Sequence, residues 1–249
     1  MVFWLLRCVV CFVQITLIYS VPCGNVLNAQ GGKVNLTSTG IPAGNANRTI
    51  SVWFMVNQSW PSPGYGYGII AFGDACGDTE FTLGFQLGPG FFFTMCDVVQ
   101  ISLNATDFLP VIGVWNHLTF TYNSQSNNIS FCVNSSTCKI VSYPLATSTT
   151  CFQIGARCID YAYNFIGLIA DACIWNRVLS VTEIAENFAG KVPLNGLVGR
   201  WKGDVDSMGH LIDFVGPNNG TLIGAISVQN IGNCPTPPTP FPTPPTPKP

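Results

Sequence analysis

Charge is scarce in this 249-residue chain: Lys, Arg, Asp and Glu make up 9% of it, with ten basic against twelve acidic residues. No basic cluster occurs, and binding to nucleic acid needs a concentrated positive surface, so we expect no nucleic-acid partner. Histidine is almost absent as well. His117 and His210 lie far from any pair of cysteines, which argues against a zinc site, and they suggest no Ser-His-Asp series.

Paired carboxylates at catalytic spacing are also lacking. Glycoside hydrolysis requires two carboxyl groups that flank the scissile bond, about 5 Å apart in retaining enzymes. The chain has no Glu-x-Asp-x-Glu pattern, and its only acids two apart are Asp78 with Glu80 and Asp204 with Asp206. We therefore expect no enzyme. A degenerate glycoside hydrolase would need an acid pair brought together from separate strands.

No apolar segment is long enough to predict a membrane-spanning helix. Residues 8–18 form a short apolar segment after the single positive charge of Arg7, and Ser20 is a small residue suited to cleavage. This pattern is typical of a secretory signal peptide, so we predict one over residues 1–20 and a mature chain that starts near Val21. The expected location is extracellular or associated with a cell wall.

Residues 235–249 have an abruptly different composition, PTPPTPFPTPPTPKP. Proline and threonine at this density cannot pack into a core, and they favour a stiff polyproline II tail. No hydrophobic run follows the tail, so we expect no glycolipid anchor signal.

Nine of the eleven cysteines follow the predicted signal peptide, and in a secreted chain they are expected to form disulfides. Cys132 and Cys138 flank a three-residue hairpin loop, 134–136, which would set them opposite each other. The predicted pairs are Cys132–Cys138, Cys23–Cys234 and Cys76–Cys96. The sequence leaves open the partners of Cys151, Cys158 and Cys173. One odd thiol remains, either free or in a disulfide with another molecule.

Seven Asn-x-Ser/Thr sequons predict N-glycosylation, which requires surface positions in a secreted protein. They begin at Asn35, Asn47, Asn57, Asn104, Asn128, Asn134 and Asn219.

Short alternating runs between Gly, Pro and Asn loops recur along the chain. In residues 49–56, Ile50, Val52, Phe54 and Val56 fall on one face, the pattern of a strand with one buried side. Further strands are predicted over 33–36, 68–72, 81–87, 91–95, 115–122, 128–133, 139–143, 152–155, 166–175, 197–201 and 221–228. About a dozen short strands predict an all-β sandwich.

The strand expected over 166–175 places Ile166, Leu168, Ala170, Ala172 and Ile174 on one face and is apolar on nearly both. We interpret Asp171 within it as a structural hydrogen-bond acceptor.

One helix is expected after this strand. Ser180 and Glu183 have the spacing of a capping box, and Leu179 and Ile184 frame them as a hydrophobic staple. The helix would end at Gly190.

Three stretches resemble the laminin G-like/pentraxin branch of the concanavalin A-like jelly rolls: TISVWFMV (49–56), VWNHLTFTYNSQSNNISFCVNSS (114–136) and NFIGLIADACIWNRVLSVTEI (164–184). The resemblance covers most of residues 23–190. It implies a concanavalin A-like jelly-roll sandwich of two antiparallel sheets with one short helix, over residues 21–234. Residues 197–234 would complete this sandwich, because so short a segment cannot bury a core of its own.

The pentraxin-like signature is matched at three positions, His117, Thr121 and Ser124, whereas Thr119 and Tyr122 depart from it. The double calcium site that the resemblance implies is not matched. Acid and amide ligands would follow Gly155, but Arg157 stands there, and its cation would repel calcium.

Calcium needs several hard oxygens in one place. One structural calcium ion is the candidate cofactor, with Asp204, Asp206, Asp213 and Asn218 as its ligands. The alternative is that these residues are solvated loop acids and Asx turns.

A Pro/Gly-rich loop supplies the candidate ligand-binding residues. The rings of Trp60, Tyr65 and Tyr67 would stack on sugars, and Asn57 and Asp74 would bind hydroxyl groups. The alternative is that these rings cap one end of the sandwich.

These observations predict a secreted, non-catalytic recognition or adhesion module whose partner is a glycan or an extracellular protein. A structural glycoprotein of a cell wall or matrix, without a soluble ligand, is the second hypothesis, and a degenerate glycoside hydrolase is the third. The resemblance fixes a fold and not a function.

Overall fold

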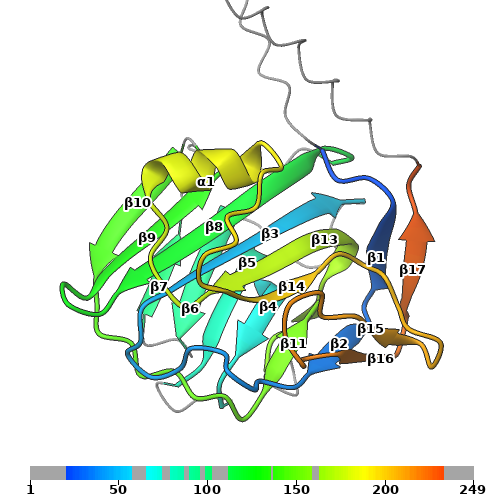
Figure 1. Cartoon of the computed structure of the whole chain (residues 1–249), viewed down its shortest axis with the longest axis horizontal. Helices are drawn as coiled ribbons and strands as arrows, with labels where there is room; N and C mark the ends of the chain where they lie inside the picture. The colour runs from blue at the N-terminus through cyan, green and yellow to red at the C-terminus, as the bar shows by residue number, and fades with distance from the viewer. Residues whose placement is uncertain are drawn as a thin grey trace, which may run out of the picture.

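Two antiparallel β-sheets stacked face to face form the body of the protein, and one helix lies outside them (Figure 1). The computed structural model describes residues 21–57, 66–74, 79–86, 90–95, 99–102, 112–135, 137–158 and 163–232. Within them, no helix is long and apolar enough to cross a membrane. The architecture is the jelly-roll sandwich that the sequence predicts.

The first sheet has the strand order β10-β9-β8-β3-β13-β1-β17, and β14 also pairs with β13. Its strands are β1 (Asn25–Gln30), β3 (Arg48–Val56), β8 (Trp115–Asn123), β9 (Asn128–Val133), β10 (Thr137–Ser142), β13 (Ile166–Trp175), β14 (Leu197–Trp201) and β17 (Ile226–Asn230).

The second sheet has the order β15-β16-β2-β11-β4-β5-β6-β7, and the two residues of β12 run parallel to β4. Its strands are β2 (Lys33–Leu36), β4 (Gly66–Phe72), β5 (Phe81–Gln86), β6 (Gly90–Met95), β7 (Val99–Ser102), β11 (Phe152–Ile154), β12 (Tyr163–Asn164), β15 (His210–Leu211) and β16 (Gly220–Ile223).

The core between the sheets is built by the predicted alternation of side chains. Ile50, Val52, Phe54 and Val56 of β3 all point inward and are at most 1% exposed. Side chains of β8, β9, β4, β5 and β11 meet them from both sheets. Apolar burial of this extent is the main stabilising contribution to the sandwich.

Strand β13 does not keep one alternation along its length, and the predicted single face from Ile166 to Ile174 is wrong. Its pairing with β3 shifts register between Ala170 and Cys173, and Asp171 adopts φ +43, as expected for a β-bulge. Before the bulge Ala170 faces outward, whereas after it Ala172 faces the core. Because of the extra residue, the even-numbered side chains next to the bulge face outward before it and inward after it.

Helix α1 (Val181–Phe188) begins and ends as predicted. The Ser180 hydroxyl accepts from the backbone N–H of Glu183 at 3.3 Å, and the Glu183 carboxylate accepts from the Ser180 N–H at 2.9 Å. This is a complete capping box. Gly190 follows the helix with φ +84, a conformation that glycine adopts without strain.

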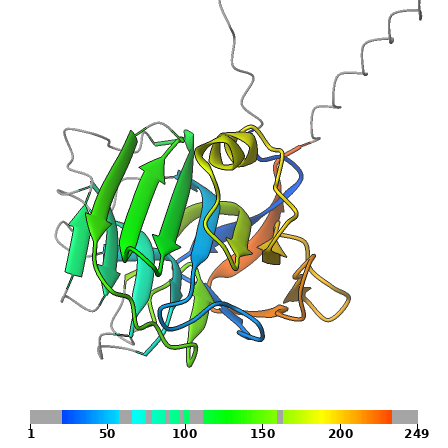
Figure 2. The same ribbon diagram turned by 60° about the vertical axis from the view of Figure 1, so that its left-hand side comes forward.

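Helix α1 covers part of the outer face of the first sheet, so the central strands β3 and β13 are buried on both sides (Figure 2). Phe188 of the helix stacks on Trp53 of β3 with ring centroids 5.4 Å apart. Asn187 donates to Ser51 at 2.9 Å and approaches Nε2 of His117 at 3.2 Å. Since the amide nitrogen only donates, Nε2 accepts and the His117 proton lies on Nδ1.

Residues 197–230 supply strands to both sheets. β14 pairs with β13 and β17 with β1 in the first sheet, and β16 pairs with β2 in the second. The single strand predicted over 221–228 is wrong, because a turn at Gly224 with φ +74 divides it into β16 and β17.

Two disulfides lie within the described residues. Cys132–Cys138 joins directly paired positions of β9 and β10 and confirms the prediction. The second disulfide is Cys151–Cys158, two cysteines whose partners the sequence left open. Cys23 is also disulfide-bonded. Its predicted partner Cys234 lies outside the described residues, as do Cys76 and Cys96.

Cys173 is the free thiol among the described cysteines, and its side chain is fully buried. Burial, reinforced by the negative charge of Asp171, raises the thiol pKa well above its usual range. A buried neutral thiol is inert, so Cys173 is poorly placed for a disulfide to another molecule.

The buried His117 makes stability depend on pH. Loss of solvation lowers its pKa to about 3, whereas the unfolded chain binds a proton below about 6.5. The stabilisation is therefore present above pH 6.5 and falls as the pH drops, by up to roughly 1.4 kcal/mol per pH unit. We expect His117→Gln to flatten this slope in urea unfolding between pH 7.5 and 4.5. The surface variant His210→Gln should keep it, and an unchanged slope in His117→Gln would contradict the assignment.

Candidate functional site

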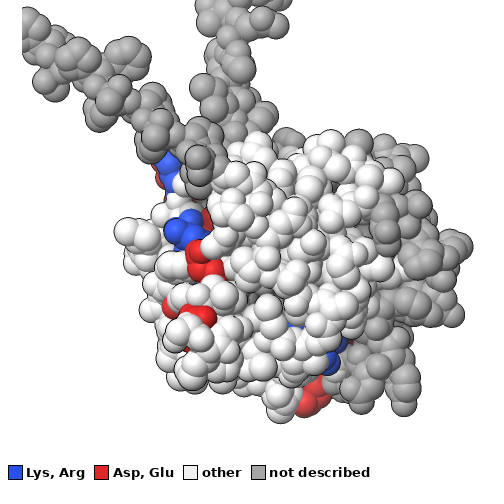
Figure 3. Space-filling model, turned by 90° about the vertical axis from the view of Figure 1, so that its right-hand side faces the viewer, with Lys and Arg blue, Asp and Glu red and all other residues white. Residues whose placement is uncertain are grey.

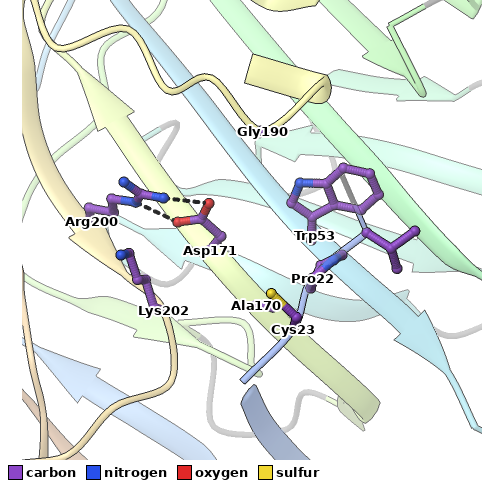
Figure 4. Close-up of a pocket in the computed structure, with 9 residues that line it drawn as sticks. Pro22, Cys23, Trp53, Ala170, Asp171, Gly190, Arg200 and Lys202 are labelled. Atoms are coloured by element: carbon purple, nitrogen blue, oxygen red, sulfur yellow. Dashed lines mark hydrogen bonds and ion pairs between the residues drawn. The ribbon is translucent and has the colours of Figure 1, made fainter. Parts of the chain in front are cut away.

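A pocket of about 170 Å³ opens on the outer side of the first sheet, beside the end of α1 (Figure 4). Its walls come from five parts of the chain: the N-terminal segment 21–23, β3, β13, the turn after α1, and β14 with the residue that follows it. The lining residues are Val21, Pro22, Cys23, Trp53, Ala170, Asp171, Gly190, Arg200 and Lys202.

An ion pair forms the polar wall of this pocket. Nε of Arg200 donates to Oδ1 of Asp171 at 2.6 Å, and its Nη2 donates to Oδ2 at 2.9 Å. Burial lowers the pKa of Arg200, but the hydrogen bonds and charge of Asp171 outweigh this and raise it. The two side chains are 21% and 24% exposed, so a ligand can reach the pair.

The bulge explains how Asp171 reaches the pocket. At φ +43 its backbone is in the left-handed region, which Asp tolerates better than most residues. The sequence interpretation of Asp171 as a structural acceptor is confirmed, but its partner is the Arg200 side chain of the neighbouring strand. This pair cannot be predicted from local sequence patterns, because Asp171 and Arg200 belong to different strands.

Lys202 supplies a second cation next to this pair (Figure 4). Its Nζ lies 4.9 Å from the centroid of the Phe214 ring, a cation–π contact. In the part of the chain that the structure describes, Lys202 has no carboxylate partner. The opposite wall is apolar, with the edge of the Trp53 ring and with Pro22 and Ala170 (Figure 4).

The outer face of the second sheet carries a different arrangement, a row of polar residues at paired positions on adjacent strands. The row consists of Thr82, Gln153, Asn35, Thr221 and His210, with Ala71 between the first two. Their chain neighbours point into the core, so these residues face outward. Asn35 and Thr221 are exposed, whereas Thr82 and Gln153 are buried.

A buried ion pair lies at the covered end of the polar row. Glu80 is fully buried, and its carboxylate accepts from Nε and Nη2 of Arg157 at 3.1 and 3.0 Å. The Thr82 hydroxyl donates to the same carboxylate at 2.8 Å. Arg157 belongs to the loop closed by Cys151–Cys158. The Glu80 oxygens are therefore committed to a guanidinium group.

The residues predicted to hold calcium are not gathered into a metal site. Both Asp213 oxygens accept backbone N–H groups, from Arg200 and Val215 at 3.0 Å and from Asn218 at 3.2 Å. Asp206 accepts from the backbone of Met208 and His210, which lowers its pKa. Across the described ranges, no group of three His, Cys, Asp or Glu side chains could hold a metal ion. The Asx-turn alternative describes these two acids.

Of the three rings predicted to form an aromatic platform, only Tyr67 lies within the described residues. Tyr67 is 1% exposed and belongs to the core, because it lies on the inner face of β4, so its ring cannot stack on a surface sugar. Trp60 and Tyr65 lie outside the described residues. Asn57 is exposed at the end of β3, and Asp74 accepts from the Thr150 hydroxyl.

The sequons have unequal access to solvent. Asn35, Asn57, Asn128 and Asn219 are exposed, and Asn104 lies outside the described residues. The side chains of Asn47 and Asn134 are half-buried and accept hydrogen bonds from the backbone of Ser124 and His117. The four exposed asparagines therefore meet the surface requirement of N-glycosylation better than the two half-buried ones.

A family model described as the concanavalin A-like lectin/glucanases superfamily matches residues 28–185. Among curated proteins none matches this chain.

Solved structures share the fold. A proposed carbohydrate-binding protein from Bacteroides ovatus has a TM-score of 0.65 and 14% identity, over 84% of this chain and 60% of that one. A heptameric SAP-like pentraxin from Limulus polyphemus has a TM-score of 0.56 and 12% identity, over 85% of this chain and 97% of the pentraxin. The CBM40 of the Ruminococcus gnavus IT-sialidase, bound to α2,3 sialyllactose, has a TM-score of 0.51 and 14% identity, over 68% of this chain and 99% of the CBM40. The chain thus spans about 60% of the length of the Bacteroides protein.

The buried pair Arg157–Glu80 should be far more important for stability than an exposed pair. Arg157→Met leaves the Glu80 charge without its partner in the interior, which we expect to cost about 3 kcal/mol or more in urea unfolding. Arg177→Met is the control, because its partner Glu183 is 28% exposed and such pairs contribute less than about 1 kcal/mol. Equal losses in both variants would contradict this difference.

Proposed function

The chain belongs to the concanavalin A-like lectin/glucanase superfamily, and we propose that it is a secreted, non-catalytic recognition module that binds carbohydrate. The pocket beside α1 is the observation that carries this proposal. It combines an apolar wall, a carboxylate and two cationic donors in one concave site. Sites for small polar ligands have this composition, with mostly apolar walls and a few placed polar groups.

Each polar group of the pocket has a role toward a sugar. The Asp171 carboxylate accepts from sugar hydroxyl groups, and the guanidinium of Arg200 donates to ring or hydroxyl oxygens. Their mutual ion pair fixes both side chains before a ligand arrives, which lowers the entropy cost of binding. The edge of Trp53 and Pro22 offer apolar contact to the C–H groups of a ring.

The sparse surface charge also suits a hydroxyl-rich partner. Figure 3 shows charged side chains in small groups on the face it presents, whereas most of the described surface there is uncharged. Solved structures with the same fold include carbohydrate-binding proteins. These likenesses support the proposal through the fold alone.

A non-catalytic role is supported by the contacts of four described carboxylates. Asp171, Glu80 and Glu183 are each held by an arginine, and Asp213 is held by backbone N–H groups. A general acid needs a protonated carboxyl group near neutral pH. The hydrogen bond from Arg177 lowers the pKa of Glu183 to about 2, so this carboxyl group is ionised at neutral pH.

The polar row of the second sheet is a weaker candidate for the ligand. Asn35 begins one sequon and Thr221 completes the sequon of Asn219, and Asn35 and Thr221 are directly paired on neighbouring strands. N-glycans are bulky, so two of them at this position would cover the row. The pocket lies on the other sheet, away from these two sequons.

The variant Arg200→Met tests the pocket. On a glycan array, we expect the secreted wild type to bind specific glycans and the variant to lose at least about tenfold in affinity, since a hydrogen bond from a charged group contributes at least about 1.5 kcal/mol. EDTA should leave binding unchanged, because the pocket contacts need no metal.

Arg177→Met is the matched control, because Arg177 forms an equally exposed bidentate pair with Glu183 outside the pocket. It should bind like the wild type. If no glycan binds, or if both variants bind like the wild type, the pocket is not a carbohydrate site. Binding abolished by EDTA would instead indicate a metal-dependent site.

Secretion and glycosylation have their own test. We expect mass spectrometry of the secreted protein to find a mature N-terminus near Val21 and glycopeptides at the four exposed sequons, with lower occupancy at Asn47 and Asn134. The reason is that an attached glycan needs an exposed asparagine side chain. A retained N-terminal segment, or occupancy confined to the two half-buried sites, would contradict this expectation.

A further inference from the structure

We propose that the pocket beside α1 is specific for an acidic monosaccharide, whose carboxylate contacts Lys202 and Arg200. This inference rests on the proposed carbohydrate-binding function and adds the charge of the ligand. It follows from three properties of the pocket: its surplus of positive charge, its size and the separation of its polar and apolar walls.

The pocket holds two cations, Arg200 and Lys202, against one carboxylate, Asp171. Two positive charges minus one negative charge leave a surplus of one. Both carboxylate oxygens of Asp171 are occupied by Arg200, so Lys202 is the cation without a counter-ion among the described residues. An anionic ligand group would supply that counter-ion in a partly desolvated site, where charge pairs are stronger than in bulk water.

Arg200 retains a donor for the same group. Its Nε and Nη2 contact Asp171, whereas no hydrogen bond from its Nη1 is present among the described residues. Lys202 is steadied by the face of Phe214. Arg200 and Lys202 both line the pocket, so a guanidinium N–H and an ammonium group are available to a ligand carboxylate.

Cleavage of the predicted signal peptide would add positive charge to the pocket. Val21 lines the pocket, and cleavage after Ser20 would turn its nitrogen into an α-amino group. Such a group has a pKa of about 7.7–8.0 and is mostly protonated at neutral pH. The mature protein would then present a third cation at the rim.

Size limits the ligand to one ring. The volume of about 170 Å³ is below the roughly 300–1,000 Å³ of sites for drug-sized ligands. Oriented with its carboxylate toward Lys202, a sugar acid would place hydroxyl groups near Asp171. Its C–H face would lie toward Trp53, Pro22 and Ala170, on the apolar wall (Figure 4). A longer glycan would enter the pocket with a single terminal residue.

Calorimetric titration of the secreted protein tests the inference with four probes: glucuronate, N-acetylneuraminate, neutral glucose and acetate. We expect at least one of the sugar acids to bind at least about tenfold more tightly than glucose and acetate, with an affinity that falls as salt is raised. Lys202→Met should weaken binding of the acid by at least about tenfold, whereas Lys202→Arg should retain it. Lys139→Met, on the exposed strand β10, removes the same charge elsewhere and should change nothing.

Each alternative result is decisive. Equal affinity for glucose and the sugar acids would overturn the inference while leaving carbohydrate binding intact. Acetate binding as tightly as the sugar acids would indicate a carboxylate site without sugar recognition. Unchanged acid binding in Lys202→Met would place the acid elsewhere. If no probe and no arrayed glycan binds, the inference and the proposed function both fail.

Discussion

Strand β13 is buried on both of its faces, and the bulge at Asp171 decides which of its side chains meet each one. Ala172 and Ile174 pack into the core between the sheets, whereas Ala170 and Trp175 pack beneath the helix side of the first sheet. Regular alternation through the strand would leave Asp171 on a face that must be apolar. The extra residue at φ +43 instead turns its carboxylate toward Arg200. The packing of the core, the surface on which α1 lies and the pocket thus all depend on this one β-bulge.

The two outer faces of the sandwich consequently differ. The first sheet is partly covered by α1 through Trp53, Phe188 and the hydrogen bonds between Asn187, Ser51 and the neutral His117. Where this cover ends, beside Gly190, the pocket remains open. The second sheet has no helix over it among the described residues, and its open end displays the sequon residues Asn35 and Thr221. The outer face of the first sheet therefore suits a bound ligand, and the outer face of the second sheet suits covalently attached glycans.

The predictable part of the structure is the part that local periodicity and capping determine. The core face of β3 and the capping box of Ser180 follow from spacing within a few residues, and the sequence shows both. The contacts that define the site do not have this property. Arg200 and Asp171 are 29 residues apart, and Glu80 and Arg157 are 77 apart. The bulge is not visible in the sequence either, because an acid in an apolar strand is also compatible with regular pairing. The prediction for Tyr67 is wrong because a loop of aromatic residues does not show which ring turns into the core.

The claim that the pocket beside α1 is the ligand site is tested most directly by a crystal structure of the secreted protein with a bound glycan. The account predicts a terminal sugar seated between Trp53 and Arg200, with the Asp171–Arg200 pair intact. A glycan bound instead on the outer face of the second sheet, with the pocket filled only by water, would contradict it.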